Sequence, residues 1–154
     1  MLPASAKRVP AHTADHINEK IQRQTQANIA YYGSIAPEAI EKRLEELDRE
    51  WDIERTLEAN AATLSLFGLL MGATVNRKWF AFPAIITGFL LQHALQGWCP
   101  PIPVFRRFGY RTRTEIDHER YALKFLRGDF EGLQATPHPE NRQKVINIFD
   151  AVTR

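Results

Sequence analysis

Two apolar stretches decide the fold: AATLSLFGLLMGATV at positions 61–75 and WFAFPAIITGFLLQHALQGW at positions 79–98. Only Asn76, Arg77 and Lys78 separate them, and neither stretch contains Asp, Glu, Lys or Arg. A helical run without charge on any face is typical of a segment that is surrounded by apolar groups. The pair therefore predicts an all-α protein built around a transmembrane helical hairpin, with the lipid bilayer as its first partner.

The lengths of the two segments leave the depth of insertion open. Positions 59–75 and 79–97 reach roughly 25 to 28 Å at 1.5 Å per residue, slightly less than a hydrocarbon core of about 30 Å. A hairpin that crosses the bilayer and a re-entrant hairpin that dips into it are both compatible with these lengths. A third reading is a soluble helical bundle whose buried core is the hairpin.

The rest of the chain divides into regions on either side of this hairpin. We expect a flexible N-terminal tail with a weak helix at 1–36, an amphipathic charged helix at 37–58, the membrane hairpin with its Gly-Trp-Cys-Pro ending at 59–113, and cytoplasmic helices at 114–154. In the charged helix, spacings of four, three and four give one apolar stripe that would dock another helix or lie on lipid headgroups. This docking stripe consists of Ile40, Leu44, Leu47 and Trp51.

Two helix starts are predicted in the last region. Thr114 with Asp117 resembles a capping box that opens a helix of roughly 114–127, and Gly128 fits its C-terminal cap. Pro139 suits the first position of a further helix.

Small residues at helical spacing predict how the hairpin associates. Gly68 and Gly72 form a GxxxG pattern, and Ala84 and Gly88 form a small-xxx-small pattern on the second segment. Small residues at this spacing allow helix backbones to approach closely in lipid. We therefore expect helix packing at these positions, in a homo-oligomer or a larger membrane complex.

Positive charge near the apolar segments predicts the orientation. Four arginines and no acid follow the second segment, at Arg106, Arg107, Arg111 and Arg113. Cations favour the cytoplasmic side, so both termini are expected in the cytoplasm. The two cations between the segments oppose this orientation but are fewer.

Three polar residues interrupt the second apolar segment, at Gln92, His93 and Gln96. Their i, i+3 and i, i+4 spacings place them close together on the helix surface. Polar groups inside a membrane face a partner helix or a cavity. Hydrogen bonding between helices is the first interpretation, and conduction of a solute or anion by an oligomer is the alternative.

The single cysteine, Cys99, is the one candidate for chemistry. One cysteine excludes an internal disulfide and a paired-cysteine zinc site. Cys99 stands beyond the C-terminal end of an expected helix, where the dipole does not stabilise a thiolate. It is either a small apolar residue at the membrane boundary, a sulfur-carrying or redox-sensing thiol, or a lipidation site.

Residues 50–72, EWDIERTLEANAATLSLFGLLMG, together with residues 88–130, GFLLQHALQGWCPPIPVFRRFGYRTRTEIDHERYALKFLRGDF, carry a family resemblance. The sequence resembles the YgaP-type inner-membrane domain, a small bacterial family of largely unknown function, over about residues 50–115. Its specific element is a Gly-x-Cys-Pro ending, matched by Gly97 to Pro100. The resemblance implies a helical hairpin in the bacterial cytoplasmic membrane. The chain differs from the minimal family in its N-terminal extension and C-terminal helices, and it has no rhodanese-like domain.

The remaining polar motifs predict no reaction. His12 and His16 are four residues apart, but no third metal ligand accompanies them. Phosphate loops, nucleophile elbows and metalloprotease motifs are absent from the sequence, and a net charge of +2 gives no electrostatic case for nucleic acid. We therefore expect a non-catalytic membrane accessory or scaffold protein without cofactor or metal. A sulfur or redox role of Cys99, solute conduction and a soluble bundle are the alternatives.

Overall fold

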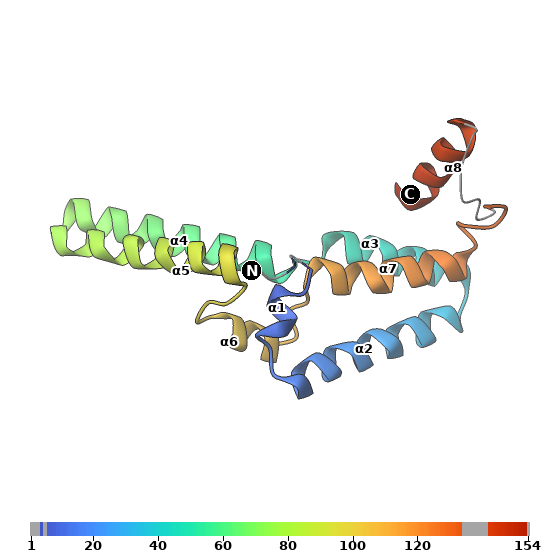
Figure 1. Ribbon diagram of the computed structural model, residues 1–154, viewed down its shortest axis with the longest axis horizontal. Helices are drawn as coiled ribbons and strands as arrows, with labels where there is room; N and C mark the ends of the chain where they lie inside the picture. The colour runs from blue at the N-terminus through green and yellow to red at the C-terminus, as the bar shows by residue number, and fades with distance from the viewer. Residues whose placement is uncertain (1–3, 5, 134–141, 154) are drawn as a thin grey trace. The chain divides into compact units, whose positions relative to one another are not determined.

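The computed structural model describes residues 4, 6–133 and 142–153, and every regular element in that part of the chain is a helix (Figure 1). The predicted all-α class is therefore confirmed. The chain forms two compact units, of which the first comprises Met1–Arg23 and Trp51–Ile116 and the second comprises Gln24–Glu50 and Asp117–Arg154.

The first unit contains the hairpin and the short helices near its base. Its complete elements are α1 (Arg8–Ala11), α4 (Ile53–Thr74), the 3-10 helix η1 (Arg77–Phe80), α5 (Ala81–Gln96) and α6 (Ile102–Arg107). The second unit contains α3 (Pro37–Arg49) and α8 (Arg142–Thr153). Helices α2 (Asp15–Gly33) and α7 (Arg113–Arg127) contribute residues to both units.

Local signals begin and end the hairpin helices. Asp52 caps α4, because its Oδ1 accepts a hydrogen bond of 2.7 Å from the backbone N–H of Arg55. At the tip, the Asn76 side chain accepts a bond of 2.9 Å from the backbone N–H of Lys78. Gly97 then ends α5 with a φ of 81°, a left-handed conformation that glycine adopts without strain. The chain thus turns back on itself, and α4 and α5 lie side by side (Figure 1).

The expected transmembrane spans are not supported. Judged by length and hydropathy together, none of the helices in the described ranges is suited to cross a membrane. The physical reason differs between the two helices. Helix α5 is 16 residues long, and α4 has 22 residues but carries Glu54, Arg55 and Glu58 in its first two turns.

A small core holds α1 and α6 against the base of the hairpin. Its buried members are Val9, Ile53, Leu57, Cys99 and Ile102, with Phe105 packed against them. Helix α6 lies among the prolines, where no helix was expected, and α1 lies in the tail that was expected to be flexible apart from one weak helix. A proline in the first turn of a helix costs no hydrogen bond, so α6 accommodates Pro103 directly after its first residue, Ile102.

In the second unit, α2, α3 and α7 meet around a buried carboxylate. Glu119 is fully buried, and its Oε1 accepts a bond of 2.8 Å from Arg43 Nε. The Asn28 amide also donates to this carboxylate, at 3.3 Å. A buried charge is tolerated when it is paired and hydrogen-bonded in this way. The hydrogen bonds therefore fix the relation of the three helices within this unit.

The capping box of α7 begins two residues earlier than predicted, at Thr112, and the helix itself begins at Arg113. Thr112 Oγ1 accepts from the backbone N–H of Glu115 at 3.3 Å, and Glu115 Oε2 accepts from the backbone N–H of Thr112 at 2.8 Å. This reciprocal pair is the capping box, in place of Thr114 with Asp117. The predicted cap at Gly128 has the expected left-handed φ of 91°, whereas the predicted helix start at Pro139 lies outside the described residues.

Candidate functional site: an apolar hairpin with a polar junction at its base

Large apolar side chains are exposed around most of the circumference of the hairpin. Along the apolar part of α4, these side chains occur at consecutive turns and point in different directions around the helix axis. They therefore do not form a single stripe. The exposed set is Leu64, Leu66, Phe67, Leu69, Leu70, Val75, Trp79, Phe80, Ile85, Phe89, Leu91 and Leu95. Soluble monomers rarely expose continuous apolar patches of this kind, and such patches mark interaction surfaces.

The predicted small residues divide between the inside and the outside of the hairpin. A Cβ at Gly68 would lie 2.7 Å from Pro83 Cδ, and a Cβ at Gly72 would lie 2.7 Å from the Phe80 ring. These two glycines therefore allow α4 to approach the returning chain of the same hairpin. Ala84 and Gly88 are exposed instead, and a Cβ at Gly88 would meet no atom within 4 Å.

The tip of the hairpin combines aromatic rings with cations. The Trp79 ring makes edge-to-face contacts with Phe67 and Phe82, each with ring centroids 6.1 Å apart. Arg77 and Lys78 are exposed beside them. Aromatic and basic side chains together are typical of segments that lie at the polar–apolar boundary of a bilayer.

A polar junction of Arg8, Glu54 and His93 lies at the base of the hairpin. Arg8 Nη1 donates to the Ala94 carbonyl at 3.1 Å, and Arg8 Nη2 lies 3.6 Å from Glu54 Oε1. The His93 side chain is buried, and within the described residues neither of its ring nitrogens has a hydrogen-bond partner. Sequence reasoning missed this junction because Arg8 lies in the tail that was expected to be loose.

Burial controls the ionisation of these groups. It raises the pKa of Glu54, and the Arg8 guanidinium opposes that rise only in part. Burial also lowers the pKa of His93, and the positive charge of Arg8 lowers it further. The imidazole is therefore held in its neutral form.

The other two polar residues of α5 do not join His93 at this junction. Gln92 is half-buried and Gln96 is exposed. None of the three is among the residues that line the apolar cavity between α4, α5 and the turn before α6.

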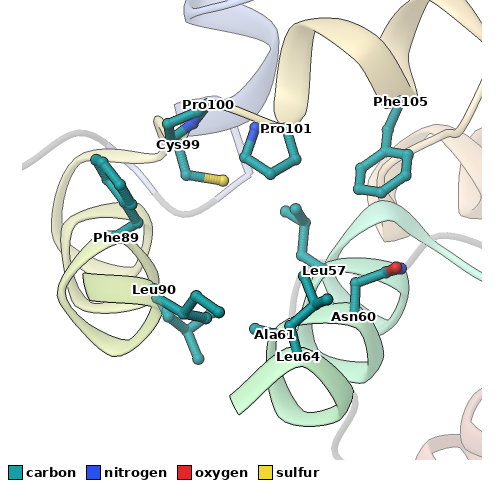
Figure 2. A pocket seen from close by; sticks show the side chains of 11 residues that line it. Leu57, Asn60, Ala61, Leu64, Phe89, Leu90, Cys99, Pro100, Pro101 and Phe105 are labelled. Carbon is teal, nitrogen blue, oxygen red and sulfur yellow. The ribbon is translucent and has the colours of Figure 1, made fainter. Parts of the chain in front are cut away.

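An apolar cavity of about 320 Å³ lies between α4, α5 and the turn that leads to α6 (Figure 2). Helix α4 contributes Leu57, Asn60, Ala61 and Leu64; α5 contributes Ile86, Phe89 and Leu90; the following segment contributes Cys99, Pro100, Pro101 and Phe105. Figure 2 shows the Cys99 thiol directed into this space. No charged side chain is among the lining residues.

The environment of Cys99 does not resemble that of an activated thiol. Burial raises the pKa of the Cys99 thiol, and the backbone N–H of Ile102 lowers it to a smaller extent. Reactive cysteines have a lowered pKa and partial exposure, usually beside cations. The thiol is therefore mainly protonated near neutral pH.

The predicted docking stripe is mostly internal. Ile40, Leu44 and Leu47 are buried in the protein. Trp51 alone is exposed, outside α3, with the Arg55 guanidinium 4.3 Å from its ring centroid. Three of the four residues therefore stabilise the fold and are not available to a partner.

The four flanking arginines also separate by environment. Arg106 and Arg111 are buried, whereas Arg107 and Arg113 are exposed. The guanidinium of Arg106 binds Glu115, Asn18 and Thr13. Arg106 therefore has a structural role, whereas the sequence indicated only a cation beside the membrane. In the ranges that the structure describes, no group of three or more His, Cys, Asp or Glu side chains could hold a metal ion.

Comparison with family models, with curated proteins and with solved structures gives no significant match to this chain. The resemblance to the YgaP-type domain, with Gly97 to Pro100 as its specific element, stays a prediction from the sequence.

Proposed function

We propose that the hairpin of α4, η1 and α5 is a lipid-embedded anchor, and that the protein is a non-catalytic scaffold which holds its helical second unit at a membrane surface. The observation that carries this proposal is the exposure of large apolar side chains around most of the hairpin's circumference. Each methylene withdrawn from water contributes about 0.8 kcal/mol, so this surface favours an apolar surrounding.

The charge pattern favours lipid over a protein partner. No Asp, Glu, Lys or Arg occurs between positions 59 and 76 or between 79 and 105. A partner helix would cover one face and leave the opposite face polar, whereas lipid contacts every face. The hairpin has apolar residues on the faces that its own packing leaves exposed, as an embedded element requires.

Charged groups at both ends limit the depth of insertion. Each hairpin helix offers about 16 apolar residues, or about 24 Å, against a hydrocarbon core of about 30 Å. A cation at the bilayer centre costs about 2.5 to 3.5 kcal/mol, which places Arg77 and Lys78 in a headgroup layer. Glu54, Arg55 and Glu58 place the base of the hairpin in a polar layer as well.

Flotation of the full chain with phosphatidylcholine vesicles tests the anchor. These vesicles carry no net charge, so association reports apolar burial. We expect the wild type to float and to remain with the vesicles in alkaline carbonate. A Leu66→Lys, Leu70→Lys variant, altered at two exposed positions of α4, should lose most of this association.

The matched control is Phe125→Lys, which changes a side chain that is 72% exposed in α7 and therefore outside the hairpin. It should float like the wild type. Equal flotation of all three proteins, or recovery of the wild type in the soluble fraction, would reject the anchor.

A further inference from the structure

We propose that the cavity between α4, α5 and the turn before α6 is a binding site for one acyl chain of a bilayer phospholipid. This inference rests on the proposed function, because it assumes that the hairpin lies in lipid. It adds a specific site with a defined occupant to an otherwise non-specific apolar surface.

The size and lining of the cavity favour a hydrocarbon occupant. Its volume of about 320 Å³ is within the range of about 300 to 1,000 Å³ that is typical of small-molecule sites. Nine of the eleven lining residues have aliphatic, aromatic or proline side chains (Figure 2). A polar ligand would lose hydrogen bonds to water on entry and regain few of them here.

The two polar groups in the wall do not change this preference. The amide of Asn60 already donates to the Thr56 carbonyl at 2.8 Å. The Cys99 thiol behaves as a small apolar group when it is protonated, and burial raises its pKa.

The route into the cavity favours an acyl chain of the bilayer as its occupant. Leu64 and Phe89 line the cavity and are also exposed on the outside of the hairpin. The apolar surface is therefore continuous from the outer face into the cavity. An acyl chain can enter along it without crossing polar groups.

Photo-crosslinking tests the site in the full-length protein. The protein is reconstituted in phosphatidylcholine vesicles that contain a small fraction of phosphatidylcholine with a diazirine on one acyl chain. After illumination, labelled residues are identified by mass spectrometry. We expect label on Cys99, although this side chain is only 4% exposed, as well as on the outer residue Leu66, which is 60% exposed.

Adjacent alanines of α4 provide matched variants. Ala61 lines the cavity, whereas Ala62 is exposed and is not among the lining residues. Ala61→Phe should fill the space and reduce the labelling of Cys99 at least five-fold relative to Leu66. Ala62→Phe should leave this ratio unchanged.

The wild type alone decides the question if Ala61→Phe fails to fold. Label on Leu66 without label on Cys99 would overturn the acyl-chain site and leave the membrane anchor standing, with a protein side chain or a second copy as the occupant. Absence of label from both residues would reject the anchor and the site together.

Discussion

Arg106 and Glu115 form a bidentate ion pair in the first unit: Arg106 Nη1 lies 2.6 Å from Glu115 Oε2, and Nη2 lies 2.8 Å from Oε1. The arginine side chain is 1% exposed. Its remaining donors bind Asn18 Oδ1 at 2.8 Å, Thr13 Oγ1 at 3.2 Å and the Tyr110 carbonyl at 3.0 Å. One guanidinium thus joins α6, the start of α7 and the N-terminal segment.

Removal of the Arg106 charge should strongly destabilise the protein. Arg106→Met keeps most of the side-chain volume but leaves the Glu115 carboxylate without its counterion. Loss of one partner of a buried pair costs about 3 to 5 kcal/mol, and the partial exposure of Glu115 places the expected loss near the lower value. Urea unfolding followed by circular dichroism measures it.

The control for this substitution is Arg107→Met, because Arg107 is the exposed neighbour on the same helix. Its free energy of unfolding should stay within about 0.5 kcal/mol of the wild type. Equal losses in the two variants would contradict the assignment of Arg106 as a buried structural residue.

The same pair makes stability depend on pH. Burial raises the pKa of Glu115, but hydrogen bonds from Arg106 and from the Thr112 backbone lower it more, so the folded value lies below the ordinary 4.5. A depressed folded pKa contributes stability that is present above the unfolded value and is lost as pH falls through the folded value. The free-energy difference between wild type and Glu115→Gln should therefore be constant above about pH 5 and shrink below 4.5.

Unfolding of both proteins from pH 7 to pH 3 measures this dependence. The raised pKa of Glu54 has the opposite effect on stability, but it is common to the two proteins and cancels in their difference. A difference that stays constant down to pH 3 would show that Arg106 does not lower the pKa of Glu115 in the folded protein.

Substitution by alanine at two glycines of the hairpin should change the stability of the protein in opposite directions. At Gly68 the new Cβ would lie 2.7 Å from Pro83 Cδ, so the helices must separate, and overpacking of this kind costs about 1 to 3 kcal/mol. At Gly88 the Cβ meets nothing within 4 Å, so the higher helix propensity of alanine should stabilise the protein by about 0.5 to 1 kcal/mol. Thermal unfolding of both variants in one buffer compares them, and the same sign at both positions would contradict the packing.

The sequence predicted the positions of the hairpin helices better than the contacts that their side chains make. The two hairpin helices and the short turn between them follow from local signals, namely the charge-free runs and the three residues that separate them, Asn76 to Lys78. These signals act within a few residues and can be read directly. Helix α6 was missed because a proline-rich segment ends one helix and can also begin the next.

The candidate site depended on contacts between distant positions. The Arg8 side chain reaches the carbonyl of Ala94, 86 positions along the chain, and no local pattern in the tail announces this contact. In the same way, the stripe of Ile40, Leu44 and Leu47 has the same sequence pattern whether it is buried internally or binds a partner. Periodicity identifies an apolar face, but it does not identify the surface that covers that face.

Cys99 should react slowly with thiol reagents. Its side chain is buried, and burial raises its pKa, so both access and the thiolate fraction are low at pH 7.5. Each unit of pKa above the solution pH lowers the thiolate fraction about ten-fold. We expect N-ethylmaleimide to modify the folded protein at least ten-fold more slowly than the urea-unfolded chain, in which the same single cysteine is exposed.

This rate separates the scaffold from the sulfur-carrier or redox alternative. A thiol that carries sulfur must present a thiolate to its reaction partner near neutral pH. Ile102→Ala provides a matched test, because it opens the core beside Cys99 while keeping the thiol in place; it should accelerate alkylation by increasing exposure. Rapid alkylation of the folded wild type, with a pH midpoint below the ordinary value for cysteine, would instead favour a reactive Cys99.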